Sequence, residues 1–306
     1  MPVWVFHPHC GSVDDRESDL GLETVDKNNN WDHVVTPHRG WFDFDLLETW
    51  RGRDLIFVLV KRDFVSVYKQ TVLGPLWFVI QPVATTMVFV LLFGTIARLP
   101  TGGTPPFLFY LSGLVMWNFF AASFTKTSDI FANNAAIFSK VYFPRLTVPV
   151  SSIISTLLTF AIQFVLFLVF AIGFGYLASP LAALKAALLT IPLVFYTAML
   201  GLGIGLCVSS LTTRFRDLGY LHGFALQLWM YSTPVIYPIS MLPHRWRIIS
   251  VINPMAAPVT TFRNLWLGTP APEELSWIVG AAITACLLFI GLALFSHTQR
   301  LATDTV

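Results

Sequence analysis

Long apolar runs are the feature that most constrains this chain, because about 20 apolar residues are enough to cross a lipid bilayer as a helix. Backbone N–H and C=O groups in lipid must be satisfied within the segment, so each run is predicted to be an α-helix. The predicted spans cover residues 76–97, 107–124, 146–177, 181–211, 220–237 and 276–295. The sequence therefore predicts an all-α integral membrane protein with six transmembrane helices.

Charge is scarce and unevenly placed. Only 12% of the 306 residues are charged, against about a quarter in soluble domains. Twelve of the 17 Asp and Glu residues lie before residue 64. The pattern predicts a polar cytoplasmic arm at 1–45 and a membrane domain at 46–306. Aromatic residues in the arm leave open whether it folds, binds a partner or is disordered.

The arm also carries His7, His9 and Cys10, whose side chains can bind metal ions. Zinc sites in proteins usually draw four ligands from two such groups, and no second group accompanies this one. The sequence therefore predicts no metal site.

The distribution of Lys and Arg predicts the orientation, since short cytoplasmic loops carry an excess of both. With the N-terminus inside, and counting from residue 51 onward, eleven such residues fall on the inner side and five on the outer side. The outer ones are Arg98, Lys185, Arg245, Arg247 and Arg263. We expect both termini to be cytoplasmic.

A charged segment runs into the first span without a loop. Phe57, Val60 and Phe64 recur at helical spacing, which is typical of an amphipathic helix lying in the membrane interface. The predicted corner follows, where glycine permits a turn and proline begins the next helix. The residues of the helix end and corner are Lys69, Gln70, Gly74, Pro75 and Trp77.

Several catalytic motifs are missing. The chain has no G-x-x-x-x-G-K-[ST] for binding ATP through a P-loop, no H-E-x-x-H and no G-x-S-x-G. The glycines of GLGIG at 201–205 lie in an apolar run, so they favour close helix packing over nucleotide binding. No carboxylate pair for acid–base chemistry lies inside a predicted span. No span carries an ionisable residue in its middle either, although proton-driven transporters normally have such residues there. If the chain moves a substrate, another subunit is expected to supply the energy.

Three segments resemble one family of membrane proteins. YKQTVLGPLW at 68–77, KVYFPR at 140–145 and STPVIYP at 232–238 occur in the family's order, with Gln81-Pro82 and Asn253-Pro254 in place. They are similar to permease subunits of ABC type-2 exporters, which move O-antigen, capsule or teichoic acid. The resemblance covers about residues 46–300.

The resemblance implies a homodimer of multi-pass permeases in the bacterial inner membrane, with two separate ATPase subunits that hold ATP and Mg²⁺. This chain would have no catalytic residues. Short re-entrant helices at about 240–268 would gate the outer exit. A cytoplasmic helix would couple the permease to the ATPase through Ser128, Asp129, Ile130, Phe131, Asn133, Asn134, Phe138, Lys140 and Tyr142.

The aromatic content of 15% favours a sugar polymer as cargo, because rings can slide along the apolar faces of sugars. O-antigen on a lipid carrier is the expected cargo. Capsule, teichoic acid, and a drug or small lipid remain alternatives, as does a membrane-embedded glycosyltransferase. The expected channel-lining aromatics are Phe78, Phe89, Phe93, Trp117, Phe119, Phe120, Trp229, Tyr231 and Tyr237.

Overall fold

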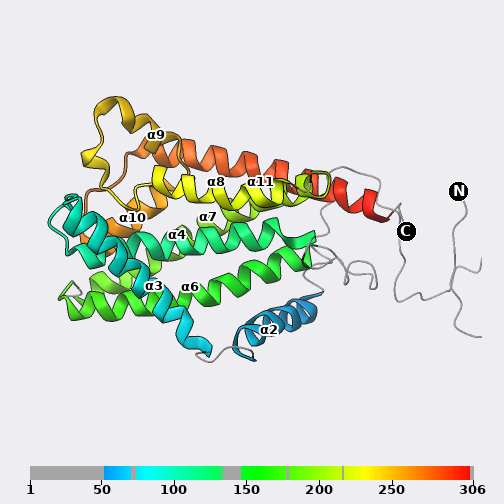
Figure 1. The fold of residues 1–306 in the computed structure, drawn as a ribbon, viewed down its shortest axis with the longest axis horizontal. Coiled ribbons are helices and arrows are strands. Elements are labelled where there is room, and N and C mark those ends of the chain that lie inside the picture. Colours follow the sequence, from blue (N-terminus) through cyan, green and yellow to red (C-terminus); the bar gives the residue numbers. More distant parts are fainter. Residues whose placement is uncertain are drawn as a thin grey trace, which may run out of the picture. The chain divides into compact units, whose positions relative to one another are not determined.

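The computed structural model describes residues 52–69, 74–131, 133, 146–176, 179–215 and 217–303, and the helices in these ranges are drawn in Figure 1. Within them every regular element is a helix, which confirms the predicted all-α class. The predictions for the arm at 1–45, including His7, His9 and Cys10, lie outside the described residues.

Five helical segments are long and apolar enough to cross a membrane, judged by length and composition. They match the first, second, third, fourth and sixth predicted spans. The first is α3 (Trp77–Phe89) continued by the π-helical turn η2 (Val90–Ile96). The others are α4 (Pro106–Ser128), α6 (Thr147–Gly173), α7 (Pro180–Thr212) and α11 (Glu274–Thr303).

The fifth predicted span is not confirmed at full length. Residues 220–237 contribute only the 15-residue helix α8 (Leu218–Ser232). At 1.5 Å per residue α8 is about 22 Å long, short of a hydrocarbon core of about 30 Å. It stops because Pro234 disfavours helical backbone at the preceding Thr233, whose φ and ψ are −89° and 142°.

α4 is the central helix of the bundle. Of the most apolar 18-residue stretch of α4, 78% of the residues are buried, whereas the corresponding share for Trp77–Ile96 is 17%. The α4 helix begins at Pro106 and ends at Ser128, and we name the two ends of the bundle after these residues. The Pro106 end also holds η3 (Ile239–Met241), η4 (His244–Trp246), α9 (Arg247–Ile252) and α10 (Ala256–Leu267) (Figure 1).

The glycine-rich run of α7 lets three helices approach closely, as the sequence predicted. A Cβ on Gly201 would lie 2.8 Å from the Cβ of Ser123 on α4. A Cβ on Gly203, on another face of α7, would lie 2.7 Å from the backbone nitrogen of Leu288 on α11. Side chains at these positions would push the backbones apart, so small residues set the spacing of α4, α7 and α11.

The helix α2 (Arg53–Lys69) packs on the bundle through a face that includes Val60 of the predicted stripe. Ile56, Leu59 and Val60 are its buried apolar residues, whereas Phe57 is 71% exposed. Phe57 therefore faces away from the bundle and is free to enter a membrane interface.

We predict that Gly203→Ala destabilises the protein by about 1–3 kcal/mol, because the new methyl group overlaps the backbone of α11. Gly223→Ala on α8 is the matched control, since a Cβ there meets nothing within 4 Å. It should be neutral or slightly stabilising. Thermal unfolding in detergent measures both variants, and equal effects would contradict the packing account.

Candidate functional site

The corner before the first span contains the predicted glycine. Gly74 has a φ of +47°, which favours glycine, and begins the 3₁₀ helix η1 (Gly74–Leu76). Pro75 lies in that turn, and Trp77, 46% exposed, starts α3 directly. Lys69 is the last residue of α2, and Gln70 lies outside the described residues. The chain therefore passes from η1 into the span without a loop.

The first residues of the predicted coupling helix belong to the bundle itself. Ser128 is the last residue of α4 and is 3% exposed. Ile130, 1% exposed, packs in an apolar cluster with Leu59, Val148, Leu202, Leu206 and Phe295. The ring of Phe131 lies 5.2 Å from that of Phe295 on α11. A surface that binds another protein would therefore begin after these residues.

Asn133 is the first strongly exposed position of that segment in the described residues, and its backbone N–H donates to the backbone carbonyl of Asp129 at 2.9 Å. Asn134, Phe138, Lys140 and Tyr142 lie outside the described residues. The role of the segment in coupling stays a prediction.

At the Pro106 end, Asn253 connects α8 to α10. Its side-chain oxygen accepts the indole N–H of Trp229 at 2.9 Å and the backbone N–H of Met255 at 3.0 Å. Its amide nitrogen donates to the hydroxyl of Thr233 at 2.9 Å. That hydroxyl in turn donates to the carbonyl of Trp229. Asn253 thus binds the end of α8 to the start of α10, which gives the Asn-Pro and Ser-Thr-Pro motifs one shared structural role.

Arg263 of α10 lies in a cradle of oxygens and is 2% exposed. Its Nε donates to the Phe109 carbonyl at 3.2 Å and to the Ser112 hydroxyl at 3.3 Å. Its terminal nitrogens donate to the carbonyls of Pro234 and Val235, the latter at 2.5 Å. The guanidinium carbon also lies 3.8 Å from the centre of the Phe109 ring.

Burial lowers the pKa of Arg263 to about 9, which leaves the guanidinium protonated at neutral pH. The distribution of Lys and Arg predicts Arg263 to be an outer loop charge, but it is a buried structural cation. Sequence reasoning missed its role, and the only available signal was a single Arg in an otherwise uncharged segment, Ala256–Leu267.

Three predicted channel aromatics form a seam between α4 and α8. The Trp229 ring lies 4.9 Å from Phe120 and 6.5 Å from Trp117. Trp117 and Phe120 are 4% and 0% exposed. Within this chain the two rings therefore hold α8 against the central helix.

The remaining predicted aromatics are dispersed. Phe119 is buried and packs on Phe160 of α6. Phe89 and Phe93 of the first span pack with Tyr110. Phe78 is half-buried, and Tyr231 is exposed. The Tyr237 hydroxyl donates to the Ser232 carbonyl at 2.9 Å. The nine aromatics do not meet on one surface, and whether any lines a path stays a prediction.

The bundle-facing side of α8 ends in a polar contact at the Ser128 end. His222 Nε2 lies 3.9 Å from the carboxylate of Asp129, and its ring meets Phe124 edge-on at 5.9 Å. The opposite side of α8 carries an exposed stripe at helical spacing, formed by Tyr220, Phe224, Gln227 and Tyr231. We call these four residues the α8 stripe.

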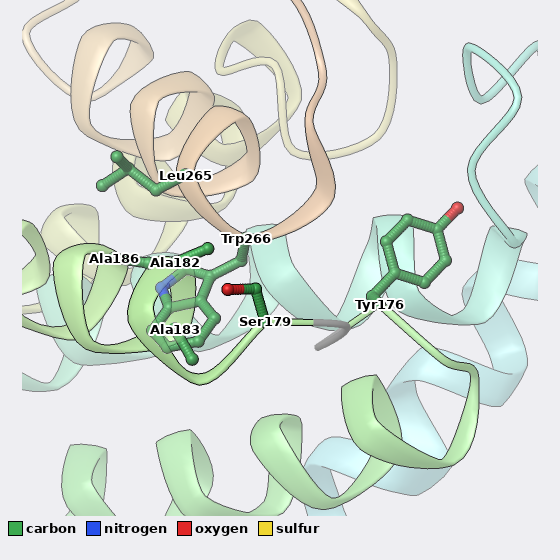
Figure 2. Close-up of a pocket in the computed structure, with 7 residues that line it drawn as sticks. All are labelled: Tyr176, Ser179, Ala182, Ala183, Ala186, Leu265 and Trp266. Carbon is green, nitrogen blue, oxygen red and sulfur yellow. The ribbon is translucent and has the colours of Figure 1, made fainter.

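A small hollow lies at the Pro106 end, between the start of α7 and α10 (Figure 2). Its volume is about 50 Å³, and Tyr176, Ser179 and Trp266 contribute polar groups to its lining. The Trp266 indole donates to the Thr190 hydroxyl at 3.0 Å. A cavity of this size holds a few water molecules and is far below the roughly 300 Å³ of a small-molecule site.

These features define a multi-pass membrane protein whose connections at the Pro106 end are held by polar side chains. Residues 54–267 match the ABC-2 type transporter family, and this is most of the described part of the chain. The chain belongs to that family of transport subunits, so the predicted membership is confirmed.

Three curated relatives illustrate the likeness. An O-antigen export system permease protein RfbA of Klebsiella pneumoniae is 30% identical over 80% of this chain and 92% of its own length. The RfbA protein of Myxococcus xanthus is 26% identical over 85% and 98%. The polysialic acid transport protein KpsM of Escherichia coli is 24% identical over 79% and 92%.

We predict that Asn253→Ala lowers the free energy of unfolding by about 1–3 kcal/mol, because it leaves buried donors at Trp229 and Met255 without an acceptor. Asn264→Ala, a nearby asparagine on α10, removes a single side-chain bond, to the Thr269 carbonyl, and should cost less. Thermal unfolding followed by tryptophan fluorescence measures both. A larger loss for Asn264→Ala would contradict the assigned role of Asn253.

Proposed function

We propose that this chain is the channel-forming permease of an ATP-driven exporter that moves a lipid-linked polysaccharide, with O-antigen as the first candidate, across the bacterial inner membrane. The observation that carries the proposal is near full-length similarity to O-antigen export permeases within the ABC-2 type transporter family. Capsular polymer is the second candidate, because a polysialic acid transport protein is also a relative.

ATP hydrolysis would belong to a separate ATPase subunit bound to each protomer of a permease homodimer. The absence of a P-loop motif from the full sequence supports this division of labour. ATP binding and release on the partner would shift the permease between two states that bind the partner differently.

The proposed topology has six crossings with both termini in the cytoplasm. Although α8 has only 15 residues, the chain runs alongside α4 beyond the end of that helix. His222 lies beside Asp129 at one end of α4, and Val235 lies beside Gly113 nearer the other end. The turn residues after Ser232 would thus complete a crossing that the helix alone does not make. In this topology the Ser128 end would lie in the cytoplasm and α9 and α10 at the outer leaflet, where they would gate the exit.

The α8 stripe is the best candidate for the polymer-facing surface. Tyr220, Phe224 and Tyr231 are 89%, 62% and 48% exposed, and Gln227 adds an amide between them. Tyrosine combines an apolar ring with a hydrogen-bonding hydroxyl, which suits the faces and hydroxyls of sugars. A lipid-facing surface has little use for an amide, so the stripe favours a path that polymer and water enter.

Deletion of the gene should remove the surface polysaccharide and leave polymer on its lipid carrier inside the cell. The chain supplies a path and no chemistry, so polymer synthesis would continue. Immunoblotting of surface and total polysaccharide measures the outcome, with plasmid complementation as the control. Unchanged surface polysaccharide in the deletion strain would contradict the proposed cargo.

A cysteine at position 133 should crosslink to the copurified ATPase, whereas one at position 130 should not. Asn133 is exposed, and Ile130 is 1% exposed inside the bundle. Crosslinking by a short bifunctional reagent in membranes measures the contact. Strong crosslinking from position 130 alone would contradict the placement of the coupling surface.

Replacing Phe224 with alanine should lower export several-fold without lowering stability, because the ring is exposed on the α8 stripe. Phe195→Ala on α7 is the matched control, since Phe195 is 64% exposed but lies on another helix. Export rate and thermal unfolding are compared for both variants. Equal export by the two would argue that the stripe faces lipid.

A further inference from the structure

The guanidinium of Arg263 joins three parts of the chain that are distant in sequence. Arg263 itself lies on α10, two of its acceptors are the consecutive carbonyls of Pro234 and Val235, and the others are the Phe109 carbonyl and the Ser112 hydroxyl on α4. The carbonyls after α8 have no helical partner of their own. A single planar side chain thus satisfies them and binds them to the central helix.

The surroundings of Arg263 exclude a role in binding cargo directly. The side chain is 2% exposed, all three of its nitrogens donate to protein oxygens, and the Phe109 ring lies against its carbon. No carboxylate among the described residues lies within ion-pair distance of it. An anionic ligand would have to displace several buried hydrogen bonds at once.

The cradle is also tightly closed. A Cβ on Gly113 of α4 would overlap the guanidinium and would lie 3.2 Å from both the carbonyl oxygen and a methyl carbon of Val235. Gly113 therefore admits the cation between α4 and the segment after α8. Opening this contact would leave a buried charge and its acceptors unpaired, which is strongly unfavourable.

The geometry points to Arg263 as a positioning residue, a static clamp that makes residues 233–237, α10 and the Pro106 end of α4 move as one body during transport. At the other end, the contacts described for α8 with α4 and Asp129 are made by His222 alone, which lies 3.9 Å from the Asp129 carboxylate and meets the Phe124 ring edge-on. Movement of α8 relative to α4 therefore occurs at the Ser128 end. The inference rests on the proposed function only for its export readout.

The test replaces the clamp with a covalent one. Cysteines at 113 and 235 can reach each other, because the Cβ of residue 113 would lie 3.2 Å from a Val235 methyl carbon, the position of a cysteine sulfur. Natural Cys10, Cys207 and Cys286 are first replaced by alanine. Arg263→Met is then combined with Gly113→Cys and Val235→Cys, and each single-cysteine version serves as a control that cannot crosslink.

Arg263→Met alone should lower export at least about tenfold, because the segment after α8 is no longer bound to α4. Arg263→Lys should recover part of the loss, since an ammonium cannot reach all four acceptors. The crosslinked variant should recover export to near the cysteine-free background, and the single-cysteine variants should not. Lys185→Met, which removes an exposed charge from α7, should export normally.

The inference is overturned if Arg263→Met exports normally, if no crosslink forms, or if the crosslinked protein stays inactive. If Arg263→Met does not assemble, the crosslink must restore copurification of the ATPase and thermal stability; failure to do so also overturns it. Crosslink yield, assembly and stability need no polymer, so they separate this inference from an error in the proposed cargo.

Discussion

The constraint on which this structure depends is that backbone groups in an apolar environment must find partners inside the protein. Helices satisfy it along their length, and the difficulty arises where α8 ends at Ser232, shortly before Pro234. The freed carbonyls of Pro234 and Val235 are satisfied by Arg263, and Asn253 binds the end of α8 to the start of α10. Two polar side chains thus allow an irregular segment to pack against α4.

This arrangement gives the two ends of the bundle different characters. At the Pro106 end, buried hydrogen bonds and a cation tie α4, α8 and α10 together. At the Ser128 end, α8 has one long polar contact, between His222 and Asp129. The segment after α4 is buried at Ile130 and exposed at Asn133. A permease driven by a partner at that end would combine a fixed outer connection with a more adjustable inner one.

Much of the fold could be predicted from the sequence, because length and hydropathy are local properties. Five runs became span-length helices within a few residues of the expected bounds. The fifth predicted span is longer than the helix because the sequence stays apolar past Pro234. The backbone before a proline disfavours the helical conformation, so the helix ends earlier. The GLGIG run was correctly interpreted, since small residues in an apolar helix have few roles other than close packing.

The site was much harder to predict because it depends on which side chains meet. Trp117, Phe120 and Tyr231 are all aromatic, yet Trp117 and Phe120 are core residues and Tyr231 is exposed. Arg263 carries nothing in its local sequence that distinguishes a buried clamp from a loop charge. The α8 stripe became visible only when the bundle face of that helix, marked by His222 and Trp229, was known.

The most direct measurement of the central claim is transport by purified components. The permease and its ATPase partner are reconstituted in liposomes, and movement of a lipid-linked polysaccharide to the opposite side is followed. The account predicts transport that requires both subunits and hydrolysable ATP. Transport by the permease alone, or a complex that moves small lipids but no polymer, would contradict it.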